Sequence, residues 1–331
     1  MDRNIYPWGK YLLPDDKVSP SPTYDTRPCL ELFEEKTFPA VDERVGSLTY
    51  YFYDPTRHGY PADGHYPLIF ALHGAGAALH GIEAVAWSGA AMFASPAYQE
   101  RMGGAYILVP LANESLDEDG SLKGLWMTPS GPSDLSIYEP EILAQVESYL
   151  KDSRIAALVG TDTVYADTLF ALLDSTKAAY PAIKKTVLFG TSSGGYGAWR
   201  VLIDRPEAFA FAVVMAGAYL PATCELQKIE DSGCEVLVCH SRCDEAVPFD
   251  LTTAPNMPFF EASRHFRTYC PVLARRGDRG VASNVGADNY EIGQHCINDI
   301  VQQDLLYDDG SPCDPGIPEG ITGLVRKYAV G

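Results

Sequence analysis

The sequence lacks long apolar runs, because no segment reaches the 18 consecutive apolar residues that a bilayer-spanning helix requires. The opening Met1–Lys10 also lacks the basic stretch and apolar core of a secretory signal. Eight cysteines are sparse for 331 residues, so a disulfide framework is not indicated. We therefore expect a cytoplasmic protein whose thiols are reduced.

Positive charge is scarce, since 25 Lys and Arg residues stand against 44 Asp and Glu residues and give a formal net charge of -19. Such a surface repels nucleic acids and anionic membranes, because binding them requires basic groups that neutralise phosphates. We expect no nucleic-acid partner and no membrane partner. A small neutral or cationic substrate is easier to accept than a polyanion, and these totals give no indication of the oligomeric state.

Internal repeats and low-complexity linkers are absent as well, and 46% of the residues are hydrophobic, which is typical of a folded protein. We expect an N-terminal wrapping segment at 1–45, one main domain at 46–310 and a C-terminal tail at 311–331. The irregular segment at about 111–163 is either an insertion over a site or a plain surface excursion.

Short apolar runs alternate along the chain with segments of helical period. Most of these runs are unbroken, as is typical of strands buried on both faces. The alternation predicts a mostly parallel sheet covered by helices, with ligands bound beyond the carboxyl ends of the strands. The expected strands are Ser47–Asp54, Pro67–His73, Ala105–Pro110, Thr186–Phe189, Phe211–Ala216, Glu235–Cys239 and about Asn289–Ile292. The expected helices are Ile82–Arg101, Tyr138–Leu158, Val164–Tyr180, Gly195–Asp204, Phe259–Leu273 and Ile297–Leu306.

Two adjacent serines stand in the most apolar part of the chain, within the segment GTSSGG at 190–195. The pattern G-x-S-x-G has Ser192 at its centre, directly after an expected strand and directly before an expected helix, which is the context of a nucleophile elbow. Small residues are needed at Gly190 and Gly194, where the backbones cross. The alternative is a glycine-rich turn without chemistry.

Five segments in this order resemble the α/β-hydrolase family, and more narrowly the esterases related to poly(3-hydroxybutyrate) depolymerases and feruloyl esterases and the prolyl-oligopeptidase-type hydrolases. They are PLIFALHGAG (67–76), AYILVP (105–110), GTSSGGYGAWRVLIDRPEAFA (190–210), VLVCHSRCDEAVPF (236–249) and GQHCIND (293–299). The resemblance implies an α/β-hydrolase fold with a sheet of about eight strands, and a catalytic triad of serine, histidine and aspartate in the domain at 46–310.

A serine hydroxyl is a poor nucleophile until a histidine removes its proton. Only His265 and His295 follow Ser192 late enough to match the family order of nucleophile, acid and base. His265 lies in a segment of helical period that explains it as a surface or core residue. We therefore expect His295 to be the base, and the alternative is a histidine that caps the final helix.

The base needs an orienting carboxylate, which the family carries three or four residues before a Val-Pro pair. Asp244 stands three residues before Val247 in this sequence and is the expected acid, while Glu245 and Asp250 rank after it. A turn or helix-cap aspartate is the alternative. A disulfide between the neighbouring Cys243 and Cys296 is conceivable, although two reduced thiols fit a cytoplasm better.

The family also places two backbone donors at the oxyanion. The resemblance assigns one to Ser193 and the other to the loop after the second expected strand, where Ala75 is preferred and Gly74 or Gly76 is an alternative. Three aromatic residues lie on segments that could reach a substrate pocket or could equally be core: Trp126, Tyr196 and Tyr219.

These residues favour a serine hydrolase that cleaves carboxylic esters through an acyl-enzyme, without a cofactor and without a metal. A peptidase or amidase of prolyl-oligopeptidase type and an acyltransferase are alternatives that keep the same chemistry. A non-catalytic binding protein with a hydrolase fold is the alternative from another class.

Overall fold

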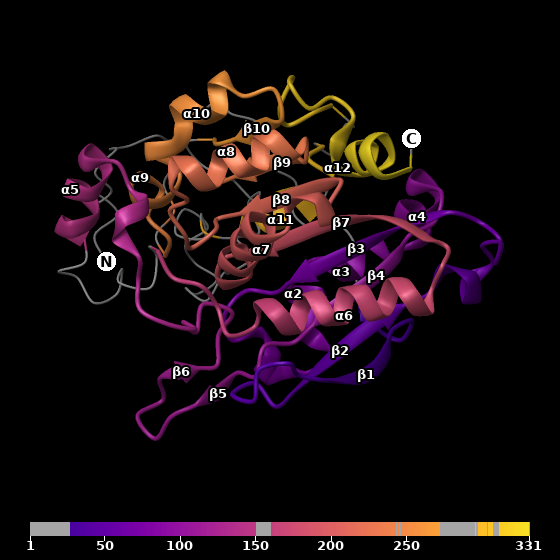
Figure 1. Cartoon of the computed structure of the whole chain (residues 1–331). Coiled ribbons are helices and arrows are strands. Elements are labelled where there is room, and N and C mark those ends of the chain that lie inside the picture. The colour runs from indigo at the N-terminus through magenta and orange to yellow at the C-terminus, as the bar shows by residue number, and fades with distance from the viewer. Residues whose placement is uncertain are drawn as a thin grey trace, which may run out of the picture.

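An eight-stranded sheet runs through the centre of the computed structural model, in the order β1-β2-β4-β3-β7-β8-β9-β10 (Figure 1). The structure describes residues 27–149, 160–242, 244, 246–271, 295, 297–302, 304–306 and 311–330. Strand β2 is antiparallel to both of its neighbours and all other pairs are parallel, which confirms the predicted mostly parallel sheet. The strands are β1 Glu34–Pro39, β2 Ser47–Tyr53, β3 Tyr66–Leu72, β4 Tyr106–Pro110, β7 Ile183–Thr191, β8 Phe211–Met215, β9 Glu235–Cys239 and β10 Phe266–Tyr269, with β5 Ser115–Leu116 and β6 Leu122–Lys123 in a separate hairpin.

Six of the expected strands correspond to β2, β3, β4, β7, β8 and β9, and the seventh, Asn289–Ile292, lies outside the described residues. Strand β1 was not expected, because this edge strand alternates partly buried with exposed residues and has no apolar run. The expected helix Phe259–Leu273 is wrong: helix α10, Met257–Ala262, ends before Ser263 and strand β10 follows. The Ser263 hydroxyl accepts hydrogen bonds from the N–H groups of His265 and Phe266, which turns the chain out of the helix.

The expected helix Ile82–Arg101 is divided into three short helices: α2 Glu83–Trp87, α3 Ala90–Phe93 and α4 Pro96–Met102. Gly89 has a φ of 79°, so α2 cannot continue through it and α3 begins directly after it. Pro96 cannot continue a preceding helix, so α4 begins there. Helix α11 also ends earlier than expected, because Asp304 and Leu305 have positive φ angles. Of the expected helix Tyr138–Leu158, the structure describes α5 up to Tyr149.

The remaining elements lie between and around the strands. The other α-helices are α1 Arg27–Leu30, α5 Pro140–Tyr149, α6 Ala166–Ala179, α7 Ser193–Asp204, α8 Thr223–Ser232, α9 Phe249–Thr252, α11 Asn298–Gln302 and α12 Gly320–Val325. Short 3₁₀ turns are η1 Pro55–His58, η2 Ala77–His80, η3 Leu135–Ile137, η5 Pro206–Ala208 and η6 Ala254–Asn256, and η8 Arg326–Val330 is a π-helical turn. Helices α6 and α7 confirm their predicted positions, whereas α8 and α12 were not expected.

Helices cover both faces of the sheet, and alternate residues of each strand belong to different cores. In β3, Leu68, Phe70 and Leu72 pack on the side of α6, α7, α8 and α10, which lies toward the viewer in Figure 1. Ile69 and Ala71 pack on the opposite side with α1 to α4, α11 and α12. Side chains on neighbouring strand positions point to opposite faces, so a strand buried on both faces reads as an unbroken apolar run.

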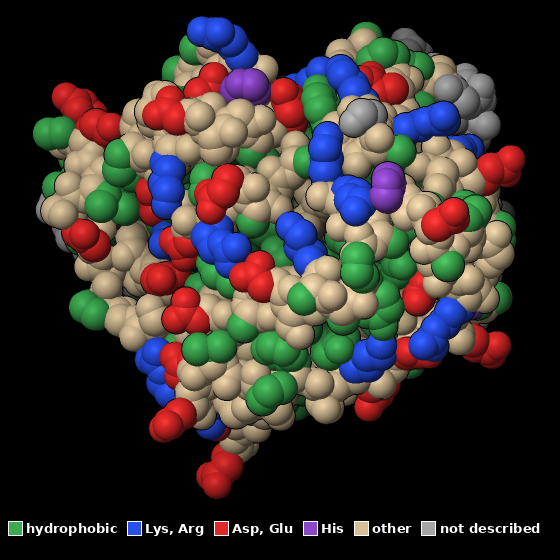
Figure 2. All heavy atoms as spheres, turned by 45° about the vertical axis from the view of Figure 1, so that its right-hand side comes forward, with side chains coloured by type: hydrophobic (Ala, Val, Ile, Leu, Met, Phe, Trp, Pro, Cys, Tyr) green, Lys and Arg blue, Asp and Glu red, His purple; other side chains and the backbone are tan. Residues whose placement is uncertain are grey.

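The surface carries charges of both signs. On the face shown in Figure 2, Lys and Arg side chains are interspersed with Asp and Glu side chains. No helix that the structure describes is both long enough and apolar enough to cross a bilayer.

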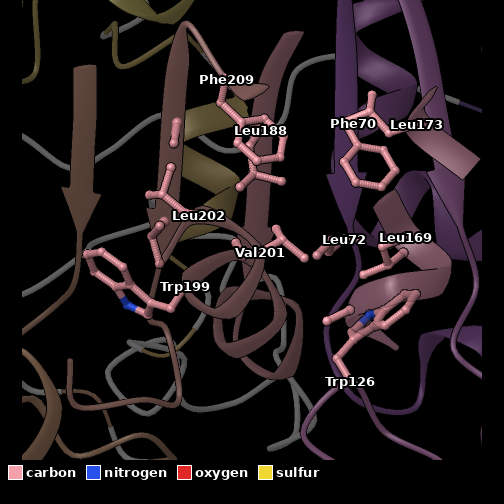
Figure 3. Packing of buried hydrophobic residues seen from close by; sticks show 14 of the residues in the cluster. Phe70, Leu72, Trp126, Leu169, Leu173, Leu188, Trp199, Val201, Leu202 and Phe209 are labelled. Atoms are coloured by element: carbon pink, nitrogen blue, oxygen red, sulfur yellow. The ribbon is translucent and has the colours of Figure 1, made fainter. Parts of the chain in front are cut away.

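The core on the α6 and α7 side joins the central strands to the irregular segment after β4. Figure 3 shows Leu72 of β3, Leu169 of α6 and Trp126 close together. The Trp126 side chain is fully buried, and a Cβ on Gly197 of α7 would lie 3.3 Å from the Trp126 Cβ. Part of the excursion at 111–163 is therefore built into the core of the domain.

Replacing Leu188 with alanine should lower the free energy of unfolding by about 2–5 kcal/mol, because the side chain is fully buried at the centre of β7 and the variant leaves a cavity. Leu116 on hairpin strand β5 is 60% exposed, so Leu116→Ala should change the same quantity by less than about 0.5 kcal/mol. Denaturant unfolding of both variants measures the difference, and equal losses would contradict this account of the core.

Candidate active site

Ser192 forms the turn between β7 and α7. Its φ of 57° and ψ of -120° are unusual for a residue with a side chain, and such strain is typical of the elbow that presents a nucleophile. The turn is tied to its neighbours, because Ser192 N–H donates to the carbonyl of Met215 over 2.9 Å and the Ser192 carbonyl accepts from Tyr196 N–H over 3.0 Å. The side chain of Ser192 is half-buried at the carboxyl edge of the sheet.

The elbow glycines allow main chains to approach closely. A Cβ on Gly194 would lie 2.2 Å from the carbonyl oxygen of Leu72 and 2.4 Å from that of His73. A Cβ on Gly190 would lie 2.3 Å from the carbonyl oxygen of Gly194. These distances confirm that small residues are required at both positions, because a side chain there would push the start of α7 away from the end of β3.

Asp244 and His295 meet in space although 51 residues separate them. The Nδ1 of His295 lies 2.8 Å from Oδ2 and 3.0 Å from Oδ1 of Asp244, within hydrogen-bond distance of both oxygens. Asp244 follows β9 and Ser192 follows β7, and the ends of these strands are in register through β8. The predicted nucleophile, acid and base therefore lie at the same edge of the sheet.

The Asp244 carboxylate is 3% exposed and is held by several donors besides His295. Its Oδ1 accepts from the N–H groups of Ala246 and Val247, each over 2.8 Å, and its Oδ2 lies 3.1 Å from Nε2 of His240. Burial alone would raise the pKa of Asp244, but His295 and His240 outweigh it and hold the pKa below the ordinary value. The carboxylate stays ionised and can orient an imidazole.

His240 is a second histidine on this aspartate. Its Nε2 lies between two acceptors, Asp244 Oδ2 and the carbonyl of Val247 at 3.0 Å, so this nitrogen carries a hydrogen. Its Nδ1 contacts the Thr253 hydroxyl over 2.7 Å. His240 thus holds the loop after β9 through Asp244 and Val247, and its direct bond to Asp244 could not be read from the sequence.

The loop after β3 faces the elbow. A Cβ on Gly74 would lie 3.6 Å from the Cβ of Ser192, so the loop passes directly beside the nucleophile. Ala75 is exposed and Gly76 has a φ of 83°. Within the part of the chain that the structure describes, the N–H groups of Ala75 and Ser193 have no acceptor, as two oxyanion donors require.

His73 orients the peptide unit that contains the Ala75 N–H. Its Nδ1 lies 2.8 Å from the Gly74 carbonyl and must donate, and its Nε2 accepts from Ala112 N–H over 3.1 Å, which defines a neutral tautomer. Burial lowers the pKa of His73 to about 4, with the Gly74 carbonyl acting in the opposite direction. Because C=O and N–H of one trans peptide point in opposite directions, holding the Gly74 carbonyl turns the Ala75 N–H away from the His73 ring.

The three aromatic residues considered for a pocket are all 0% exposed and lie in the core, so none of them lines an open pocket in this structure. Each polar atom has a partner in the protein: Trp126 Nε1 donates to the His73 carbonyl over 3.1 Å, and the Tyr196 hydroxyl donates to the Thr161 carbonyl over 2.8 Å. The Tyr219 hydroxyl bonds to Glu225. The large apolar area of these three side chains is buried in the core.

The residues ranked below the expected triad lie elsewhere. His265 Nδ1 contacts Glu235, the first residue of β9, so it lies at the edge of the sheet opposite to Ser192. Asp250 is exposed in the first turn of α9. Glu245, Cys243 and Cys296 lie outside the described residues.

The chain is similar to several known proteins. The model of the family described as "Putative esterase" matches residues 158–292. A solved structure described as a thermostable esterase has a TM-score of 0.53 and 21% identity, and the match covers 83% of this chain and 61% of that one. The acylaminoacyl peptidase of Pyrococcus horikoshii gives 0.40 and 12%, covering 81% and 40% of the two chains. The BES protein from Bacillus cereus gives 0.44 and 14%, covering 80% and 96%.

None of the curated proteins matches the chain. The chain spans less than two thirds of the length of the thermostable esterase and of the peptidase. The sheet, its two helical layers and the likeness to the thermostable esterase show that the fold is that of the α/β-hydrolases. The segment 158–292, which contains the elbow and Asp244, matches the model of an esterase family.

Gly194→Ala should destabilise the protein by about 1–3 kcal/mol or more, because the added methyl would overlap the Leu72 and His73 carbonyls. Gly131→Ala is the matched control, since a Cβ there meets nothing within 4 Å. Thermal and denaturant unfolding of both variants tests this expectation. Similar stability of the two variants would show that the crossing at Gly194 is not as close as described.

Acidification should reveal the buried neutral His73. Its pKa in the folded protein lies below the unfolded value of 6.5, so the unfolded state binds the proton more tightly and stability is lost as the pH falls from about 6.5 toward 4. The loss attributable to this residue approaches about 3 kcal/mol. The measurement is the difference in free energy of unfolding between the wild type and His73→Gln, whose amide can replace both hydrogen bonds. Parallel pH profiles would contradict the assignment.

Proposed function

We propose that this protein is a serine hydrolase that cleaves carboxylic esters of small molecules through an acyl-enzyme. The observation that carries the proposal is the contact of 2.8 Å between His295 Nδ1 and Asp244 Oδ2, on the same sheet edge as the strained Ser192. An aspartate that holds Nδ1 leaves Nε2 of His295 as the nitrogen that can act on a serine proton. The esterase-family segment favours an ester over other acyl substrates.

The reaction follows from these roles. Ser192 Oγ attacks the ester carbonyl while His295 Nε2 takes its proton, and Asp244 stabilises the imidazolium that forms. The N–H groups of Ser193 and Ala75 donate to the oxyanion of the tetrahedral intermediate. His295 then gives the proton to the leaving alcohol. A water molecule, deprotonated by His295, releases the acid and restores the serine.

The alternatives that share this chemistry differ in the leaving group of the substrate and in the molecule that accepts the acyl group. An amidase would cleave p-nitroanilides at rates comparable to p-nitrophenyl esters, and an acyltransferase would give a new ester when an alcohol is added. We propose that water is the principal acceptor and that the substrate is neutral or cationic, since the formal charge of -19 disfavours polyanions. We place no nucleic acid, membrane, metal or cofactor in this reaction.

The limits of the catalytic domain and the location belong to the same proposal. We place the catalytic domain at 46–310 together with β1 and α12, which belong to its sheet and its core. We propose 111–163 as an insertion beside the site, and this is supported by the way Trp126 packs under the loop after β3. We place the protein in the cytoplasm on the basis of its sparse cysteines.

Ser192→Ala should lower kcat for p-nitrophenyl esters by about 10⁴-fold or more, because no other group can form the acyl-enzyme. A fluorophosphonate probe should label the wild type at Ser192, as located by mass spectrometry, and should not label the variant. Circular dichroism and thermal unfolding serve as the control for folding. Labelling at another residue, or unchanged activity, would refute the proposed nucleophile.

Ser193→Ala separates the two adjacent serines. The hydroxyl of Ser193 is buried and has no partner among the described residues, whereas its backbone N–H is the proposed oxyanion donor. The variant keeps that N–H, so it should still be labelled by the fluorophosphonate and should lose less than about tenfold in kcat. A loss as large as that of Ser192→Ala would contradict this division between side chain and backbone.

A further inference from the structure

The carboxylate of Glu114 lies against the loop that carries Ala75. Its Oε2 accepts from Ala78 N–H over 3.0 Å. Gly76 directly follows Ala75, and Ala78 lies in the 3₁₀ turn η2 that follows it. Glu114 therefore binds an amide three residues after the proposed oxyanion donor, from a segment that is 36 residues away in the chain.

Ala75 is held only through the peptide units on its two sides. The preceding unit is held at the Gly74 carbonyl by the His73 ring. The following unit lies in the turn that Ala77 N–H closes onto the Gly74 carbonyl over 3.4 Å, and the bond from Ala78 N–H to Glu114 anchors the end of this turn. Without Glu114, that second unit would keep only the turn hydrogen bond from Ala77 N–H to the Gly74 carbonyl among the described contacts. Since Ala75 is exposed, packing does not hold it either.

Burying the Glu114 carboxylate costs free energy, which indicates a role beyond local structure. Its Oε1 is buried and has no partner among the described residues, and a half-satisfied buried carboxylate is unfavourable. Burial raises the pKa of Glu114 to about 7, and the hydrogen bond from Ala78 acts in the opposite direction. Buried polar groups that lack a partner in this way are concentrated at functional sites.

We propose that Glu114 is a positioning residue of the oxyanion hole, which holds the turn that carries the Ala75 N–H by accepting a hydrogen bond from Ala78. The inference rests on the proposed esterase function. Glu114 does not contact the reacting atoms in this account. It acts by keeping the loop in the geometry that binds the transition state, so its loss should affect kcat more than KM.

Three variants test the role. Glu114→Ala should lower kcat for p-nitrophenyl acetate by about 10–100-fold and change KM by less than about threefold, because the loss of one oxyanion donor costs up to about 10³-fold. Glu114→Gln retains an oxygen that accepts from an amide and should recover activity to within about fivefold of the wild type. Glu118→Ala removes a charge from an exposed position of the same segment and should match the wild type.

A trifluoromethyl ketone forms a tetrahedral oxyanion with the serine. Its inhibition constant would not change if Glu114 had a purely structural role. Its inhibition constant should rise in Glu114→Ala by about the same factor as kcat/KM falls, while inhibition by the non-fluorinated methyl ketone should stay within about threefold. Wild-type values for kcat and for the trifluoromethyl ketone in Glu114→Ala would overturn the proposal. So would a Glu114→Gln variant as impaired as Glu114→Ala.

Amide hydrogen exchange in the peptide covering 74–80 tests the positioning without activity. Exchange should be faster in Glu114→Ala than in the wild type and should return toward the wild-type rate in Glu114→Gln. Unchanged exchange in Glu114→Ala would overturn the inference. Failure of the proposed function is recognised separately, because the wild type itself would then neither hydrolyse esters nor be labelled at Ser192.

Discussion

The site depends on one close crossing of main chains, where the start of α7 passes the carbonyl oxygens at the end of β3. The absence of a side chain at Gly194 permits this approach, and the strained backbone of Ser192 is its consequence. The same crossing brings the loop after β3 beside the nucleophile, as the closeness of Gly74 to Ser192 shows. The proposed nucleophile and the proposed oxyanion loop are thus positioned by a single contact between the start of α7 and the end of β3.

Buried polar groups then orient what the crossing has brought together. Asp244 is surrounded by donors from His240, His295 and its own loop, and the carboxylate is held in one orientation. On the other side of the site, His73 and Trp126 tie the oxyanion loop to the segment after β4. That segment is where Glu114 lies, which explains how an excursion that looks irregular in sequence can support a site formed by strands and helices.

Much of the fold could be predicted from the sequence, because unbroken apolar runs are a strong signal for strands buried on both faces. The signal failed at the edges, where β1 alternates and where Phe266 and Tyr269 of β10 fall at helical spacing beside a true helix. The elbow was predictable because its pattern is local to five residues. The pocket interpretation was not supported, since Trp126, Tyr196 and Tyr219 are equally suited to core and pocket until burial is known.

The sequence by itself determined the elements with local causes. These are the strand-turn-helix at Ser192, the glycines around it and the positions of the central strands along the chain. Only the tertiary structure decided which distant groups meet, such as His295 with Asp244, His240 with the same carboxylate, and Glu114 with the oxyanion loop. The physical reason is that hydrogen bonds between side chains require distances near 3 Å, and residue spacing along a chain does not determine such distances across loops.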